Sequence, residues 1–275
     1  DTIVLASGAV RLSIDRRSGL ISYAIGPDAL LSGGSPNFYR APTDNDLGTG
    51  TDKEQAPWRV MSDARRVESI VPDPAGGAVT IRYALGEGAA RFVTRYRMAG
   101  DGMVAVSADF TPLRRDLPAP IRVGLSFAMP TRITDLAWYG RGPHDSYVDR
   151  KTGAAIRRWS GTIAGQYHDF IRPQDAGNKL DVRWMALTGA GGTGLRVTGD
   201  RPLAMTALAF PYRDLFRRPP GIWRSSDVVP REQVTLLIDG AQAGVGGNTT
   251  WNASGQPLPH YRVPLAPQSF GFTLT

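Results

Sequence analysis

Apolar and polar residues alternate with a period of two along much of this 275-residue chain. Near the N-terminus, Val10, Leu12 and Ile14 alternate with Arg11 and Ser13. A period of two places successive side chains on opposite faces of a β-strand. The same pattern predicts strands at 21–23, 79–85, 91–98, 104–110, 121–127, 234–238, 261–265 and 270–274.

Helical spacing is weak by comparison. The best helical candidate covers residues 212–218 and is stopped by a pair of prolines. Glycine and proline together supply 32 and 21 residues, which predicts many turns between short elements. Segment 34–57 is rich in glycine, aspartate and proline and is predicted to be a loop, with Trp58 among its aromatic anchors.

A dozen or more antiparallel strands without a low-complexity linker predict one domain over residues 1–275. Because apolar and polar positions alternate, each sheet is expected to bury one face. The fold class is therefore all-β, a large antiparallel two-sheet sandwich. A barrel of βα repeats is excluded, since it needs eight helices.

The composition narrows the classes of partner. Hydrophobic residues make up 41% and charged residues 21%, which excludes wholesale disorder. No apolar run approaches the roughly 18 residues of a membrane-spanning helix, so no membrane partner is expected. The net charge of +7 comes mainly from arginines scattered along the whole chain, without a basic block. We therefore expect no nucleic-acid partner. The absence of cysteine excludes disulfides and thiol nucleophiles.

The common motifs of phosphate binding, metalloproteases and serine hydrolases are absent. The glycine run at 244–247 precedes no helix and is interpreted as a tight turn. His144, His168 and His260 lie far apart in sequence, so a three-histidine metal site is a minor alternative. The acidic segment 44–46 could offer oxygens to a hard cation, but a capping turn is more typical of it. No metal site is predicted.

Glycoside hydrolysis uses two carboxyl groups placed about 5 to 9.5 Å apart. The chain has only four glutamates, and Glu87 and Glu232 lie in turns where solvent would surround them. None of the four has the sequence context of a catalytic acid, so no catalytic residue is predicted.

Four dense stretches combine aromatic residues, arginine and amide or carboxylate side chains, namely residues 38–46, 138–150, 172–184 and 244–251. In this order and spacing they resemble the C-terminal domain of family 2 β-galactosidases, known as the small-chain or fifth domain. The resemblance spans nearly the whole chain.

The resemblance implies a supersandwich of the galactose-mutarotase-like type that is a fragment of a larger enzyme. In that family the catalytic glutamates and the Mg²⁺ and Na⁺ ligands belong to an upstream barrel, so this chain is expected to hold no cofactor. The upstream β-galactosidase domains and a galactoside substrate are the implied partners. Trp251 matches the tryptophan whose ring stacks on the sugar in the family.

The sequence departs from the family at two of the four stretches. Residues 248–250 are neutral where the family has acidic residues before the tryptophan. Asp175 and Ala176 replace a Glu-Asn pair, which predicts a weaker role for these side chains. Four other residues match the family and are interpreted as structural, namely Arg141, His144, Asp149 and Arg150.

Two other functions stay open on the sequence. An aldose 1-epimerase would need a general base, usually Glu, and a general acid, usually His, in one cleft. A stand-alone carbohydrate-binding module would need only exposed aromatic side chains. A barrel domain encoded upstream would favour the β-galactosidase hypothesis over both.

Overall fold

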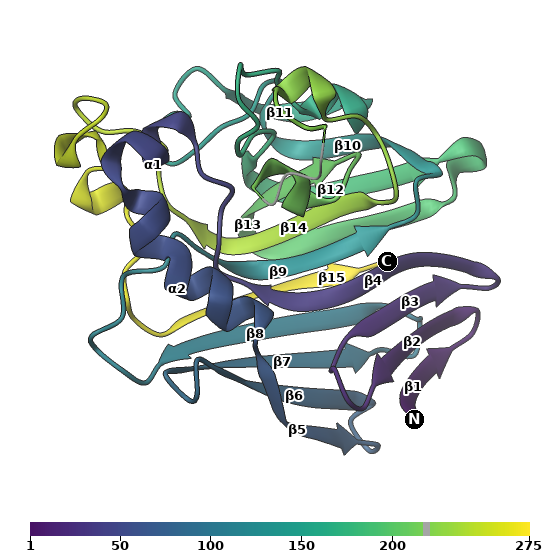
Figure 1. Ribbon diagram of the computed structural model, residues 1–275. Helices are drawn as coiled ribbons and strands as arrows, with labels where there is room; N and C mark the ends of the chain where they lie inside the picture. Colours follow the sequence, from purple (N-terminus) through teal and green to yellow (C-terminus); the bar gives the residue numbers. More distant parts are fainter. Residues whose placement is uncertain (217–220) are drawn as a thin grey trace.

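The computed structural model describes residues 1–216 and 221–275 (Figure 1). Within them lie fifteen strands, all paired antiparallel, and two α-helices. The helices are α1 (Asp44–Thr49) and α2 (Thr51–Asp63). The strands are β1 (Thr2–Ser7), β2 (Val10–Asp15), β3 (Ile21–Ile25), β4 (Asp28–Asn37), β5 (Arg66–Asp73), β6 (Ala78–Leu85), β7 (Ala90–Met98), β8 (Val104–Pro112), β9 (Arg122–Met129), β10 (Ile133–Gly142), β11 (Ala155–Thr162), β12 (Lys179–Gly189), β13 (Gly194–Leu208), β14 (Val234–Gln242) and β15 (Gln268–Leu274).

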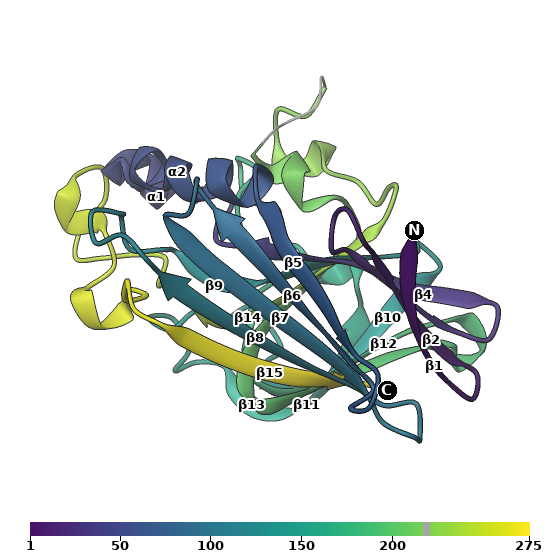
Figure 2. The ribbon, with the colours of Figure 1, turned by 90° about the horizontal axis from the view of Figure 1, so that it is seen from below.

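The strands form two layers that share one long strand. Strands β5, β6, β7, β8 and β15 lie side by side in one layer (Figure 2). The other layer contains β1–β4, β9 and β14, and it continues through β12, β10 and β11. Strand β13 belongs to both, because its first half pairs with β15 and its second half with β14. This architecture confirms the predicted all-β antiparallel sandwich.

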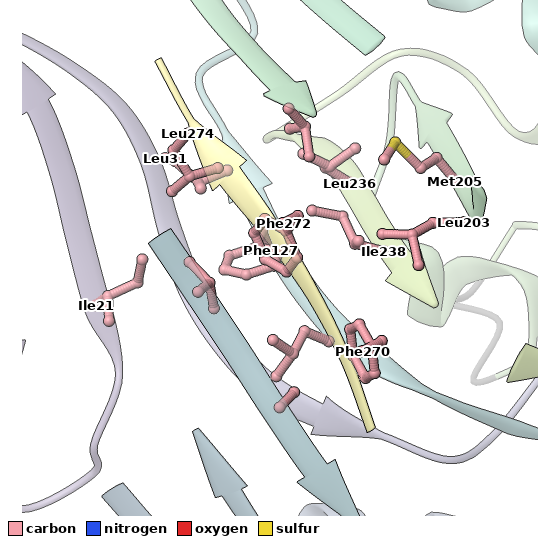
Figure 3. Packing of buried hydrophobic residues seen from close by; sticks show 14 of the residues in the cluster. Ile21, Leu31, Phe127, Leu203, Met205, Leu236, Ile238, Phe270, Phe272 and Leu274 are labelled. Carbon is pink, nitrogen blue, oxygen red and sulfur yellow. The ribbon is translucent and has the colours of Figure 1, made fainter. Parts of the chain in front are cut away.

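Buried apolar side chains from both layers meet in one core. Phe127 of β9 and Phe272 of β15 pack edge to face, with their ring centroids 6.2 Å apart (Figure 3). Leu236 and Ile238 of β14 extend the same cluster. Removing such side chains from water is the main favourable contribution to folding.

The period of two predicted most strands correctly, from the first hairpin to the C-terminal strand. The strand expected at 261–265 is wrong: a 3₁₀ helix at Pro259–Tyr261 is followed by irregular chain, and Val263 alone is fully buried there. The helix expected at 212–218 is a 3₁₀ helix at Tyr212–Leu215. Residues 217 and 218 lie outside the described part of the chain.

Segment 34–57 is not the loop that the sequence predicted. Strand β4 extends to Asn37, and helices α1 and α2 follow from Asp44 onward. Thr43 caps α1, because its side chain accepts from the backbone N–H of Asp46 while the Asp46 carboxylate accepts from that of Thr43. The capping interpretation of this acidic segment is thus confirmed. Neither helix, nor any other helix in the described ranges, is long and apolar enough to cross a membrane.

The central strands are buried on both faces. In β14, Leu236 and Ile238 point into the core, whereas Leu237 and Asp239 point outward and are equally buried. In β9, Arg122 and Gly124 occupy the outward positions. Other segments must therefore cover the outward face of this layer, and the four stretches that the sequence singled out contribute to this cover.

Candidate functional site

The structure brings the four stretches together over the outward face of β9, β14 and β13. Asp149, in the loop after β10, accepts hydrogen bonds from the backbone N–H groups of Val245 and Gly246 at 2.8 and 2.9 Å. Gln174 of the third stretch donates to Asp44 of the first at 3.2 Å. Residues about 100 to 130 positions apart in sequence are thus joined directly.

Arg40 links the glycine-rich loop, residues 244–247, to helix α1. One guanidinium nitrogen donates to the carbonyls of Ala243 and Gly244 at 3.0 and 2.9 Å, and the other donates to both oxygens of Asp46. Arg40 and Asp46 are both 1% exposed. Burial alone would lower the pKa of Arg40, but the Asp46 carboxylate raises it above its ordinary value. The charge is therefore permanent and the loop is tied to α1.

Asp175 is the centre of a second buried network. The hydroxyl groups of Tyr147 and Tyr212 donate to its two oxygens at 2.6 and 2.5 Å, and Gln242 donates at 3.3 Å. The Arg122 guanidinium lies 3.5 Å from the same carboxylate. Asp175 thus receives several donors although it departs from the family's glutamate, and the weaker role expected at this position stays a prediction.

The ionisation of this network follows from its burial. Removal from water, reinforced by the Asp175 carboxylate, raises the pKa of Tyr147 and of Tyr212 well above that of a free phenol. Both hydroxyl groups therefore stay protonated and act as donors to Asp175. Arg122 also pairs with Asp239 at 3.1 Å, and burial raises the pKa of Asp239 to about 7.

Trp251 lies beyond these networks, on the loop that they hold. It is 69% exposed and beside α1, where the loop and the helix run side by side (Figure 1). Gly48 leaves room for it: a Cβ on that glycine would lie 3.0 Å from the Trp251 backbone and ring. Trp251 has a φ of 66°, a conformation that costs a non-glycine residue about 1–2 kcal/mol. An exposed ring held in this way is available to a ligand.

Asn45 adds a further tie between α1 and the loop. Its side-chain amide donates to the carbonyls of Val245 and Gly255, at 3.3 and 2.5 Å. The loop is thus held at both ends, by Asn45 and Asp149 before Trp251 and by Asn45 again after it.

Three of the four residues interpreted as structural in the second stretch make such contacts, namely Arg141, Asp149 and Arg150. Arg141 pairs with Asp181 and donates to two backbone carbonyls. Asp149 holds the glycine-rich loop, and Arg150 pairs with Asp145 at 3.0 Å. His144 is exposed and lines a separate cleft.

The arrangement exposes the Trp251 ring, whereas the carboxylates of the buried network are closed to a substrate. Asp175 and Asp239 both interact with Arg122, yet both side chains are fully shielded from solvent. In residues 1–216 and 221–275 no group of three or more His, Cys, Asp or Glu side chains is placed to hold a metal ion. His260 packs against Tyr261 and does not line the cleft shared by His144 and His168.

Sequence reasoning missed the buried charges of β9 and β14. Asp239 follows an uninterrupted apolar run at 236–238, and Arg122 lies between Ile121 and Val123. A charged residue within an apolar strand was the signal that could have identified both. For Tyr212 the sequence pattern predicts only a place in a short helix.

Comparisons with a family model and with curated proteins both match this chain to β-galactosidases. The family model described as "Beta galactosidase small chain" matches residues 6–274. A β-galactosidase of Priestia megaterium is 33% identical over 252 residues, covering 88% of this chain and 23% of that protein. The β-galactosidase BgaC of Bifidobacterium adolescentis is 32% identical over 257 residues, covering 90% and 24%. The chain thus spans about a quarter of the length of these curated relatives.

A solved structure shares the fold over the full length. The GalM/aldose epimerase homologue from C. elegans aligns with a TM-score of 0.52, covering 100% of this chain and 98% of that one at 9% identity. At this identity the likeness concerns the fold alone. It confirms the galactose-mutarotase-like sandwich that the sequence resemblance implied.

Proposed function

Because the chain belongs to the β-galactosidase small-chain family, we propose that it forms the C-terminal domain of a β-galactosidase that hydrolyses terminal β-galactosides. Its relatives are about four times longer, so the rest of the enzyme would supply the catalytic carboxylates. We likewise assign the Mg²⁺ and Na⁺ ions of the family to the part of the enzyme outside these 275 residues. The domains that hold them are the partners of this chain.

Trp251 carries the proposal. Its exposed ring is fixed beside α1 by Arg40, Asn45 and Asp149, which position the loop before it. The apolar face of a galactose ring stacks well on an indole, and a rigid aromatic residue loses little conformational freedom on binding. We infer that Trp251 completes the sugar site without taking part in bond cleavage.

The test is the steady-state kinetics of Trp251→Ala in the complete enzyme. Loss of the stacking surface should weaken galactoside binding by about 1–3 kcal/mol, taking base–aromatic stacking as the guide. This appears as a raised KM, with kcat falling only as far as the ring holds the transition state more tightly than the substrate. Trp223→Ala is the matched control, because Trp223 is also highly exposed, at 79%, and lies in a different loop. Equal kinetics for the two variants would reduce Trp251 to a surface residue.

The epimerase alternative has less support. It needs a glutamate base opposite a histidine acid. In the part of the chain that the structure describes, the cleft containing His144 and His168 is lined by no glutamate. The four glutamates lie elsewhere, and Glu232 is occupied by ion pairs to Arg213 and Arg231.

A further inference from the structure

The cleft lined by His144 lies between the loop after β10 and the segment after β11. Its volume is about 390 Å³, within the range of roughly 300–1,000 Å³ that is typical of ligand pockets. It shares no lining residue with the loop that carries Trp251. The lining residues are Pro143, His144, Asp145, Arg150, Gly165, Gln166, Tyr167, His168, Phe170 and Lys179.

Lys179, the first residue of β12, is the unusual member of this set. It is only 1% exposed, no described protein group accepts a hydrogen bond from its ammonium, and the residue lines the cleft. The ring of Trp138 lies beside it, with its centroid 5.3 Å from the nitrogen. An ammonium group has three donors, and burying it without an acceptor is costly.

Asp145 is the carboxylate that acts on the charge of Lys179, and it already has other partners. Asp145 pairs with Arg150 at 3.0 Å and accepts from the backbone N–H of Gly177 at 3.3 Å. Burial lowers the pKa of Lys179 to about 8, and Asp145 opposes this only in part. At pH 7 the group is therefore mostly charged, and no described protein group serves as its acceptor in the cleft.

The rest of the cleft favours an anion. Lys179 and Arg150 together outweigh the single negative charge of Asp145. The exposed rings of His144 and His168 add donors at the surface. Phe170 packs edge to face on His168, at 4.6 Å between centroids, and gives the cleft an apolar side.

We propose that this cleft binds the oxyanion of a small molecule, a phosphate or a carboxylate, with the buried Lys179 ammonium as its main donor. An oxyanion would supply the missing acceptor for Lys179, in charge-assisted hydrogen bonds that are stronger than those between neutral groups. Arg150 and the two histidines would contact the same anion from the outside. The site is separate from the galactoside site and does not depend on it.

The test uses the three lysines of the chain, Lys53, Lys151 and Lys179, labelled with ¹³C at Cε. Their NMR signals are followed at pH 7 while inorganic phosphate, galacturonate or neutral galactose is added to the 275-residue chain. Phosphate, galacturonate or both should shift the Lys179 signal to saturation and raise its pKa, and which of them does so identifies the source of the oxyanion. Galactose should have no effect. Movement of all three lysine signals in parallel, or of none, would overturn the proposal.

Two variants with matched charge complete the experiment. Lys179→Met should weaken binding by at least about tenfold, as expected for loss of a hydrogen bond to a charged group. It should not lower the melting temperature, because an apolar side chain replaces an uncompensated charge. Lys53→Met removes the same charge from an exposed position on α2 and should bind as the parent does. Unchanged binding in Lys179→Met would contradict the assignment. Binding by the chain that is absent from the complete enzyme would show another domain covering the cleft, and would equally contradict it.

Discussion

Charged side chains shielded from water gather on the outward face of β9 and β14. Arg122 contacts Asp239 at 3.1 Å and Asp175 at 3.5 Å, and all three side chains have no solvent exposure. Replacing such a group leaves its partner buried without compensation, which costs far more than the intact pair contributes. At this scale the residues hold the covering loops over the sheet, and their effect should be visible in the pH dependence of stability.

Asp239→Asn should remove a pH dependence from the free energy of unfolding. Burial raises the pKa of Asp239 to about 7 from 3.8, so between these values the folded chain binds a proton that the unfolded chain does not. Stability from this group is full below about pH 4 and is lost as the pH rises to 7, by up to about 4 kcal/mol. The uncharged variant lacks this loss.

Urea unfolding of both proteins at pH 5, 6, 7 and 8 measures the effect. The parent should lose stability relative to Asp239→Asn as the pH rises, and the difference between the two should level off above pH 7. Two parallel pH profiles would show that Asp239 is ionised in the folded chain throughout.

Helix α1 acts as a platform for the Trp251 loop. Its glycine, Gly48, faces Trp251 so closely that a Cβ would contact both the Trp251 backbone and its ring at 3.0 Å. Alanine is otherwise preferred over glycine within a helix, by up to about 1 kcal/mol. The glycine therefore serves the neighbouring loop and not the helix.

Gly48→Ala in the complete enzyme should raise KM by displacing Trp251, while the intrinsic helix preference keeps α1 formed. Gly153→Ala is the matched control, since a Cβ there meets nothing within 4 Å and that glycine has no left-handed φ. KM should rise for the first variant only. An unchanged KM for Gly48→Ala, with Trp251→Ala impaired, would show that the loop tolerates the displacement.

The period of two identifies strands because it reports which face is buried, and most strands of the fold could be predicted from it. Helix α2 could not be predicted from the pattern of apolar residues. It buries Thr51, Gln55, Trp58 and Met61, which have helical spacing, but two of them are polar and Pro57 lies among them. A contact with Pro118 through the Trp58 indole N–H, at 2.8 Å, stabilises the helix from a distant segment that no local pattern reveals.

The candidate site was predictable only in part. The four stretches and Trp251 can be recognised in the sequence by their unusual composition and by their resemblance to the family. The network around Asp175 does not, because its donors Tyr147, Tyr212 and Gln242 come from three separate segments. Sequence spacing carries no information on such contacts, which exist only once the loops have closed over the sheet.

At the scale of the whole molecule, the described residues form a scaffold that presents the exposed Trp251 ring, and the carboxylates paired with Arg122 are shielded from solvent. We expect the chemistry of galactoside hydrolysis to lie outside these 275 residues. A retaining or inverting glycosidase cannot act without its acid and its nucleophile or base. The isolated chain should therefore be folded and inactive.

The most direct test is the rate of nitrophenyl β-galactoside hydrolysis by the purified 275-residue chain, measured beside the complete enzyme at equal molar concentration. A cooperative thermal transition of the chain provides the control that it is folded. We expect turnover by the complete enzyme and only the background rate with the chain alone. Turnover by the chain that disappears when one of its own residues is replaced would contradict the claim.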